Sequence, residues 1–494
     1  MNIVITVSDE YAAKVCSRLS GYQDINISIL QDHRSRSRPI QGCNNALIWT
    51  YRDILLFHEL NRDVGISGIA PGFWISLRKY IPFFLTQTDR LSYYPLAIEK
   101  HFEIFYRYAR LWHATYKKHH IGAVVFFATP HTGFDFVSYA VAEILGISVR
   151  IVNRTGLGLS SIISTSVDLW NQGCSHHIAP KTWTTSFFDP ADYQADLSLA
   201  TSVAKNRCVQ AQHSDKINYL RLAISFAMLT FKSSFKSLLK GGSPKTSSVR
   251  ESFRWLTGPR DGLQLAYERL LHVRRTRQLL KCYYKSCTSY LPSSPYIFFA
   301  AHFQPERSTA PEGGCFDNHI LALDSLLDCL PQDIHIIYKE HPRQFDIYDM
   351  RRKHARSADY YSAISAMPRV HLVDPFYDSS SLISGSVAVA TVTGTSGWDA
   401  IKAGKPSIVF GDAWYKLCGA CLHVSKLNSL SLAKLIELSP DRIEAALLDF
   451  LQWAAHSFIN APNTEQPLIA SGEQHRVDQY SVIMSRALHD SFHS

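Results

Sequence analysis

The sequence lacks the features that mark membrane-spanning and secreted proteins. None of its 494 residues lies in a run of 18 consecutive apolar residues, so no transmembrane helix is expected. The N-terminus, MNIVITVSDEYAAK, has no basic segment followed by a long apolar run and a small-residue cleavage site, so no secretory signal is expected. These two absences make the cytoplasm the expected compartment.

Cysteine is sparse and irregularly spaced. The ten cysteines lack the dense spacing of a disulfide scaffold, so reduced thiols are expected. Cys418 and Cys421 have the two-residue gap of a zinc knuckle or a redox pair, but a structural zinc site needs a second pair and none is suitably placed. No Asp-x-Asp metal motif is present either. We therefore expect no metal site and no bound cofactor.

The overall composition is that of a globular protein. Hydrophobic residues make up 46% and charged residues 19% of the chain, which excludes a disordered or collagen-like protein. A chain of 494 residues is too long for one ordinary domain and predicts two or three.

Positive charge is concentrated in one segment. The formal net charge is +9, but residues 205–285 contain 17 Lys and Arg against four acids, so the rest of the chain is slightly acidic. Clustered basic side chains gain on the order of 1 kcal/mol each near an anionic surface. This basic segment indicates peripheral contact with the inner membrane or with an anionic polymer. A solvated helical face explains the segment equally well. No nucleic-acid partner is expected.

Hydrophobic periodicity divides the chain into four segments. Residues 1–155 alternate strands, at 3–7, 25–30, 121–128 and 147–152, with helices, which predicts a parallel sheet covered on both faces. In residues 156–290 this rhythm gives way to helical periodicity at 220–239 and 263–284, which predicts a basic helical insertion or linker. Residues 291–460 restore it, with strands at 296–300, 334–338, 370–373, 387–391 and 407–410 and helices near 316–329, 351–366, 395–403 and 430–455. Residues 461–494 form a C-terminal tail or helix.

Two polar segments follow expected strands of the second α/β lobe, where doubly wound sheets bind ligands. After the strand at 296–300 come, within one loop, His302, Gln304, Pro305, Glu306 and Arg307. After the strand at 334–338 come Lys339, Glu340, His341 and Pro342. The proline restricts His341 to extended backbone angles, and such a histidine suits donation to a phosphate. The competing interpretation is two ordinary polar loops.

The most informative segment joins a strand to a helix between Thr391 and Ala400. Small residues expose backbone N–H groups at the positive end of the expected helix. They are Thr393, Gly394, Thr395, Ser396 and Gly397, and Asp399 follows them. This is typical of an anion cradle, in which glycine lets phosphate approach the main chain. It matches neither the dinucleotide fingerprint nor the P-loop. We expect Thr395 or Ser396 to be the N-cap residue.

The expected strand at 121–128 in the first lobe is followed by Thr129-Pro-His131-Thr-Gly-Phe-Asp135. Asp135 would lie in the first helical turn, where acids are common for dipole reasons alone. The functional hypothesis is a carboxylate that attacks or stabilises an anomeric centre, since glycosyl transfer passes through an oxocarbenium-like transition state. His131 is a weaker candidate for a general base.

Together, the segments AHFQPERSTAPEGG, YKEHPRQF and TVTGTSGWDAIKAGKPSIVFGDAWY resemble the capsule-polysaccharide synthesis and export family, closely over residues 294–418 and loosely through TPHTGFD. The resemblance implies a GT-B fold of two Rossmann-like lobes and transfer of 3-deoxy-octulosonic acid (Kdo) from CMP-Kdo. It also implies that Gln304-Pro305 and His341-Pro342 are paired nucleotide-binding signatures and that 393–396 is the phosphate-binding loop. Family members often have Glu where this chain has Asp399, which puts a ribose contact in doubt.

These patterns predict a metal-independent glycosyltransferase. The second lobe would bind the nucleotide sugar, the first lobe would bind a glycan or glycolipid acceptor, and closure of the lobes would exclude water. Two other hypotheses stay open at this stage: a GT-B transferase that uses a UDP- or GDP-hexose, and a non-catalytic capsule polysaccharide export factor. The helical insertion has no counterpart in the resemblance, so the acceptor is not implied by it.

Overall fold

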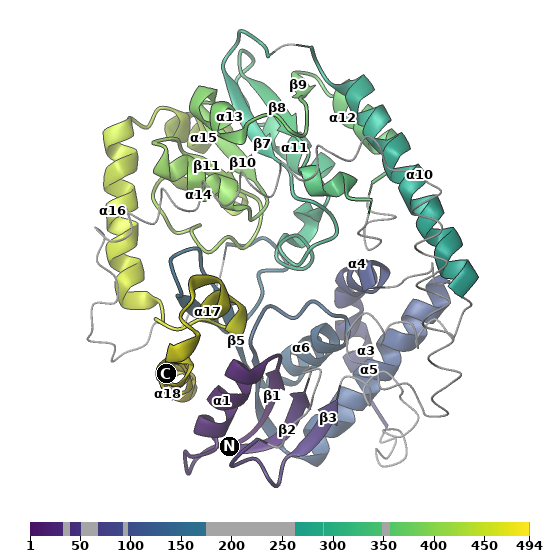
Figure 1. Ribbon diagram of the computed structural model, residues 1–494, viewed down its shortest axis with the longest axis vertical. Helices are drawn as coiled ribbons and strands as arrows, with labels where there is room; N and C mark the ends of the chain where they lie inside the picture. The colour runs from purple at the N-terminus through teal and green to yellow at the C-terminus, as the bar shows by residue number, and fades with distance from the viewer. Residues whose placement is uncertain are drawn as a thin grey trace.

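The computed structural model describes residues 1–32, 40–50, 68–91, 97–173, 262–289, 291–347 and 356–493. Within this part the chain forms two lobes, each built on one six-stranded sheet (Figure 1). The helix expected at 220–239 and most of the basic segment 205–285 lie outside the described residues.

The sheet of the first lobe has the strand order β3-β2-β1-β4-β5-β6. Its strands are β1 (Asn2–Val7), β2 (Asn26–Asp32), β3 (Leu47–Thr50), β4 (Ile121–Phe126), β5 (Ser148–Arg154) and β6 (Ser161–Ser164). All neighbouring pairs are parallel except β5 and β6, which are antiparallel. The sheet includes β6 although this strand falls in the segment that the sequence assigns to the helical insertion.

Five helices and a 3₁₀ turn cover the described part of the first sheet: α1 (Glu10–Leu19), α3 (Pro71–Leu77), η2 (Arg78–Tyr80), α4 (Ile81–Leu91), α5 (Ile98–Lys118) and α6 (Phe134–Leu145). The caps explain two boundaries. Asp9 accepts a hydrogen bond from the backbone of Ala12 and starts α1. Gly146 ends α6 with a φ of 67°, a conformation that favours glycine. Buried Tyr116 joins α5 to α6, because its hydroxyl contacts Ser138 Oγ at 2.6 Å.

The sheet of the second lobe has the order β12-β11-β10-β7-β8-β9, and all its pairs are parallel. Its strands are β7 (Tyr296–Ala300), β8 (His335–Lys339), β9 (Val370–Leu372), β10 (Ala388–Thr391), β11 (Ser407–Val409) and β12 (Cys421–His423). From β7, strands β8 and β9 follow outward on one side, and β10, β11 and β12 follow outward on the other. The chain therefore reverses between β7 and β10, the position where doubly wound sheets bind ligands.

Helices and short 3₁₀ turns surround this sheet: α10 (Gly262–Ser286), η4 (Gly314–Asp317), α11 (His319–Leu327), η5 (Pro342–Phe345), α12 (Ala358–Ala366), α13 (Ser379–Gly385), α14 (Thr395–Lys402), η7 (Val424–Lys426), α15 (Ser429–Ile436) and α16 (Pro440–Ser457). The prediction of a single helix at 430–455 is wrong. This segment forms two helices, because Pro440 has no N–H to continue a helix and instead begins α16 behind its N-cap Ser439.

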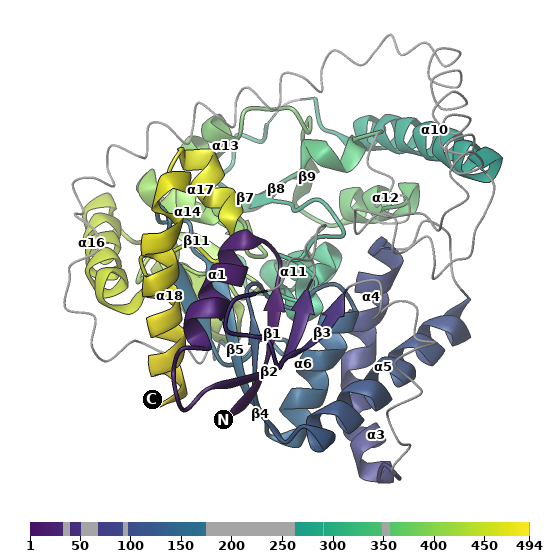
Figure 2. The same ribbon diagram turned by 60° about the horizontal axis from the view of Figure 1, so that its bottom comes forward.

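The C-terminal segment returns to the first lobe through α17 (Glu465–Ser471), η8 (Gln474–Arg476) and α18 (Val477–Phe492). Figures 1 and 2 show α18 beside α1, with both chain termini at the same end of the molecule. The contact is specific, since Lys14 pairs with Asp478 at 2.9 Å and Arg18 Nε donates to Ser481 Oγ at 2.8 Å. The expected C-terminal tail is thus an integral part of the first lobe.

The α/β architecture expected from the sequence is confirmed. Both lobes are Rossmann-like, and together they form the two-lobe GT-B arrangement. Among the described helices, none combines the length and the apolar character needed to cross a lipid bilayer.

Candidate functional site

The candidate site is built around the point where the second sheet reverses. His302 follows β7 and Thr393 follows the neighbouring β10. Nε2 of His302 accepts a hydrogen bond from the backbone N–H of Thr393 at 3.2 Å, and it lies 3.2 Å from Oγ1 of Thr391. Thr393 Oγ1 in turn donates to the carbonyl of Ser308 at 2.6 Å. The first and third segments singled out in the sequence are therefore bonded directly to each other.

The imidazole of His302 is neutral at physiological pH. Burial lowers its pKa to about 4, and the positive charge of Arg356 contributes in the same direction. A neutral ring is required here, because Nε2 must be unprotonated to accept from Thr393. His302 therefore joins two loops of the site, a different role from that of a cation that neutralises phosphate.

This burial predicts a loss of stability in mild acid. The folded-state pKa of His302 lies below the ordinary value of 6.5, so the unfolded chain takes up a proton first as the pH falls below about 6.5. Between pH 7 and pH 5 the free energy of unfolding should fall by about 2 kcal/mol from this group alone. His302→Gln should remove that share of the pH dependence, measured as urea unfolding at both pH values. An identical slope in wild type and variant would contradict it.

The start of α14 has no side-chain cap. The N-cap residue is Gly394, which corrects the expectation of Thr395 or Ser396, and no side chain caps the first turn. The hydroxyl of Tyr415 donates to the carbonyl of Gly394 at 2.5 Å. It also leaves room only for glycine at 397, where a Cβ would lie 2.3 Å from Tyr415 Oη. Thr395 is exposed and Ser396 is half-buried. Backbone N–H groups at such a helix end attract anions.

The loop after β8 joins the same region through Gln304. The backbone N–H of Gln304 donates to Gln344 Oε1 at 2.6 Å, and Gln344 Nε2 donates back to the carbonyl of Gln304 at 3.3 Å. The rings of Phe303 and His341 lie 5.0 Å apart between centroids. The three polar segments thus converge at the carboxyl ends of β10, β7 and β8. Gln304 precedes Pro305 through a cis peptide bond.

Glu340 forms a fully buried ion pair. Its carboxylate accepts hydrogen bonds from Arg356 Nε at 3.1 Å, from the hydroxyls of Tyr338 and Tyr361 at 3.1 and 3.0 Å, and from the backbone N–H of His341 at 2.8 Å. The structure therefore assigns Glu340 a role inside the lobe, where it fixes the direction in which the chain leaves β8.

Other predicted binding residues also have local partners. Lys339 Nζ donates to Ser379 Oγ at 2.6 Å, and His341 Nδ1 accepts from the backbone N–H of Arg343 at 3.1 Å, ahead of Pro342 in η5. Asp399 pairs with Lys402 at 2.8 Å. Glu306 accepts from Ser308 Oγ at 3.0 Å.

Asp135 closes the loop at the start of α6. Its two carboxylate oxygens accept hydrogen bonds from the backbone of His131 at 3.2 Å and Thr132 at 2.7 Å, and the side chain is buried. His131 Nδ1 lies 2.7 Å from the carbonyl of Thr129. These are the contacts of a helix-start residue, which is the competing interpretation that the sequence left open. The catalytic assignments of Asp135 and His131 stay predictions.

Glu312 is a carboxyl group at the junction of the lobes that the sequence analysis did not single out. Its side chain pairs with Arg307 at 3.3 Å, and Thr129 of the first lobe is among the groups that influence its ionisation. Burial raises its pKa, and Arg307 and Thr129 only partly oppose this effect. The only available sequence signal was its place within AHFQPERSTAPEGG.

Asn171 fixes this junction. Its Nδ2 donates to the carbonyls of Gly313 and Phe410 at 3.0 and 2.7 Å, and its Oδ1 accepts from the backbone N–H of Cys315 at 3.0 Å. A Cβ at Gly314 would lie 2.0 Å from that oxygen, so glycine is required there. The segment that holds Glu312 is therefore tied to both lobes.

Comparison with known proteins points to one family. Residues 312–460 match the family model described as capsule polysaccharide biosynthesis protein, which confirms the resemblance over this segment. No curated protein matches the chain.

Solved structures resemble the chain at low identity. KpsC, the β-Kdo 2,7 transferase of Thermosulfurimonas dismutans, is 10% identical with a TM-score of 0.28, over 70% of this chain and 89% of that one. The UDP-GlcNAc 2-epimerase of Neisseria meningitidis is 14% identical with a TM-score of 0.23, over 99% and 100%.

Proposed function

Because residues 312–460 carry the capsule polysaccharide biosynthesis signature within a GT-B arrangement, we propose that this protein is a glycosyltransferase of capsule or surface-glycan synthesis. The observation that carries the proposal is the convergence of three loops at the reversal of the second sheet, beside the uncapped start of α14. The donor is a CMP-activated 3-deoxy-ulosonic acid, Kdo in the first instance, as the motif resemblance implies. The acceptor is a surface polysaccharide or glycolipid.

In this scheme the donor phosphate binds at the start of α14. The backbone N–H groups of Thr395 and Ser396 would donate to an anion there, with no side-chain cap in competition. Neutral His302 orients the Thr393 loop, and Gln304 positions the loop that ends in His341. The departing phosphate is stabilised by this helix end, so the proposed reaction needs no metal.

We also propose that Glu312 is the general base that deprotonates the acceptor hydroxyl. A base works best when its pKa lies near the operating pH, and burial moves the pKa of Glu312 in that direction. Asp135 is the other candidate carboxylate, but both its oxygens already accept backbone hydrogen bonds. Its position at the junction of the lobes supports this role, because in the proposal the second lobe binds the donor and the first lobe binds the acceptor.

The test of activity is a product assay with CMP-Kdo and a panel of lipid-linked acceptors, together with thermal unfolding in the presence of CMP, UDP and GDP. The proposal expects a glycosylated product and stabilisation by CMP, because a ligand that binds only the folded state raises its stability. Stabilisation by UDP or GDP alone would indicate that the donor is a UDP- or GDP-hexose. Glycan binding without nucleotide binding would instead identify a non-catalytic export factor.

A further inference from the structure

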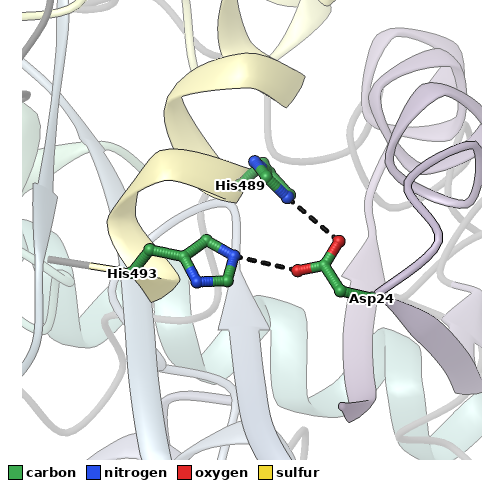
Figure 3. A group of neighbouring side chains, drawn as sticks. All are labelled: Asp24, His489 and His493. Atoms are coloured by element: carbon green, nitrogen blue, oxygen red, sulfur yellow. Dashed lines mark hydrogen bonds and ion pairs between the residues drawn. The ribbon is translucent and has the colours of Figure 1, made fainter.

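A second cluster of chemically distinctive side chains lies far from the candidate site, at the contact between the C-terminal helix and the first lobe. Figure 3 shows the carboxylate of Asp24, from the loop before β2, facing both His489 of α18 and His493 at its C-terminal end. Nε2 of His489 lies 3.1 Å from one carboxylate oxygen of Asp24, and Nε2 of His493 lies 2.8 Å from the other. Nothing in the proposed transfer reaction uses these groups.

We propose that Asp24, His489 and His493 form a binding site for a divalent transition metal, with zinc as the first choice. One ligand atom from each residue lies within 4.8 Å of the others. Four-coordinate zinc, with bonds of about 2.1 Å, needs ligand atoms about 3.4 Å apart, so the three side chains would have to move closer together to bind it. Two imidazoles and one carboxylate are a donor set that suits zinc, and they leave the fourth position to solvent.

The histidine pair is prepared for this role by its surroundings. His489 and His493 are four residues apart at the end of a helix, so their side chains lie on the same face. The ring of Tyr22 stacks on that of His489 at 3.9 Å, with 14° between the planes, and fixes its orientation. Nδ1 of His489 lies 3.5 Å from Asp490 Oδ1. Carboxylates in this position orient metal-binding imidazoles.

Proton balance is simple in this site. In the metal-free protein the Nε2–H groups of both histidines donate to Asp24. On metal binding each Nε2 must give up its N–H proton, and in each ring Nδ1 then carries the single remaining N–H. In His489 this N–H faces Asp490. The ligand atoms offered to a cation are one ring nitrogen from each of the two histidines and one carboxylate oxygen of Asp24.

A metal at this site would act on the docking of the C-terminal helix. The first half of α18 is already held on α1, through Lys14 and Asp478 and through Arg18 and Ser481. Asp24 belongs to the loop that follows α1, so a bound ion would fix the last turn of α18 to the same lobe. The expected consequence is metal-dependent stability, separate from glycosyl transfer.

Cobalt(II) is the direct probe. Full-length protein without a polyhistidine tag is stripped with chelator and titrated with Co²⁺, then with Zn²⁺ in competition. We expect one equivalent of Co²⁺ to give the visible ligand-field absorption of a four-coordinate ion, without the near-ultraviolet band of thiolate ligands. Zinc should abolish this absorption. Thiolate absorption would instead place the ion on cysteine and overturn the proposal.

Three variants locate the ion. His489→Gln and Asp24→Asn should each weaken Co²⁺ binding at least about tenfold, and His489→Gln combined with His493→Gln should abolish it. His456→Gln, on an exposed histidine of α16, is the matched control and should bind as the wild type does. His489 and His493 are partly exposed, so these substitutions should leave the protein folded. Thermal unfolding in chelator checks that each variant is folded.

Stability gives an independent readout. Zinc should raise the melting temperature of the wild type and of His456→Gln relative to chelator, and it should leave the double histidine variant unchanged. Unaltered Co²⁺ affinity in the double variant, or no binding by the wild type, would overturn the proposal. The proposed transferase activity would stand in either case, since this cluster lies outside that site.

Discussion

Arg356→Met should lower the free energy of unfolding of the second lobe by about 3–5 kcal/mol. The substitution leaves the carboxylate of Glu340 buried without its cation, because Arg356 Nε is its only ion-pair partner among the described residues. Breaking one half of a buried pair costs more than the pair itself contributes, since the remaining charge stays desolvated. Amide hydrogen exchange of β8, read by mass spectrometry, measures the effect where it arises.

Two further variants test whether the loss of stability comes from the buried ion pair. Glu340→Gln combined with Arg356→Met removes both charges and should recover part of the loss. Arg107→Met removes an exposed partner of Glu103, at 2.9 Å, and should change stability by less than about 1 kcal/mol. Equal effects of Arg356→Met and Arg107→Met would show that Glu340 is not held as the structure indicates.

Glu312→Gln should reduce the rate of glycosyl transfer by about 100- to 10,000-fold, the usual contribution of a general base. The amide keeps the size of the side chain and its contact with Thr129, so donor binding should change little. The measurement is kcat for product formation, together with the dissociation constant of CMP. Glu437→Gln, on an exposed glutamate after α15, is the control and should retain full activity.

A loss of CMP binding in Glu312→Gln with an unchanged kcat would contradict the assignment of Glu312 as a base. Asp135→Asn is the informative comparison. If Asp135 only closes the loop at the start of α6, its variant should lose stability while the purified folded fraction keeps its kcat. A selective loss of kcat in Asp135→Asn would return the catalytic role to that residue.

Much of the fold follows from local sequence patterns. The apolar runs at 3–7 and 296–300 predict β1 and β7 within a residue, because buried parallel strands need continuous apolar sequence. The strands that were missed are β3, β6 and β12, which have three or four residues each and lie at or near sheet edges. The return of α18 to α1 depends on contacts between residues more than 460 positions apart, which no local pattern contains.

The candidate site was predictable in place but not in detail. The convergence of the three loops follows from strand order alone, since the segments follow β10, β7 and β8, which are neighbouring parallel strands. Which side chains face a ligand depends on partners that are distant in sequence. Glu340 looked available for binding, but Arg356 and two tyrosines occupy its carboxylate. Glu312 was overlooked because its significance comes from Thr129, on the other lobe.

The claim on which the proposed function depends is that a nucleotide phosphate binds at the start of α14. It can be tested by calorimetric titration of CMP into wild type, Ser396→Glu and Ser429→Glu. Both substitutions add a negative charge to the first turn of a helix, where it favours the fold. Ser429 is the control because it begins α15, which follows the outermost strand β12 and not the central strand β10. We predict that Ser396→Glu weakens CMP binding at least about tenfold by repelling the phosphate, while Ser429→Glu binds as the wild type does. Equal CMP affinity in all three proteins would contradict the proposed site.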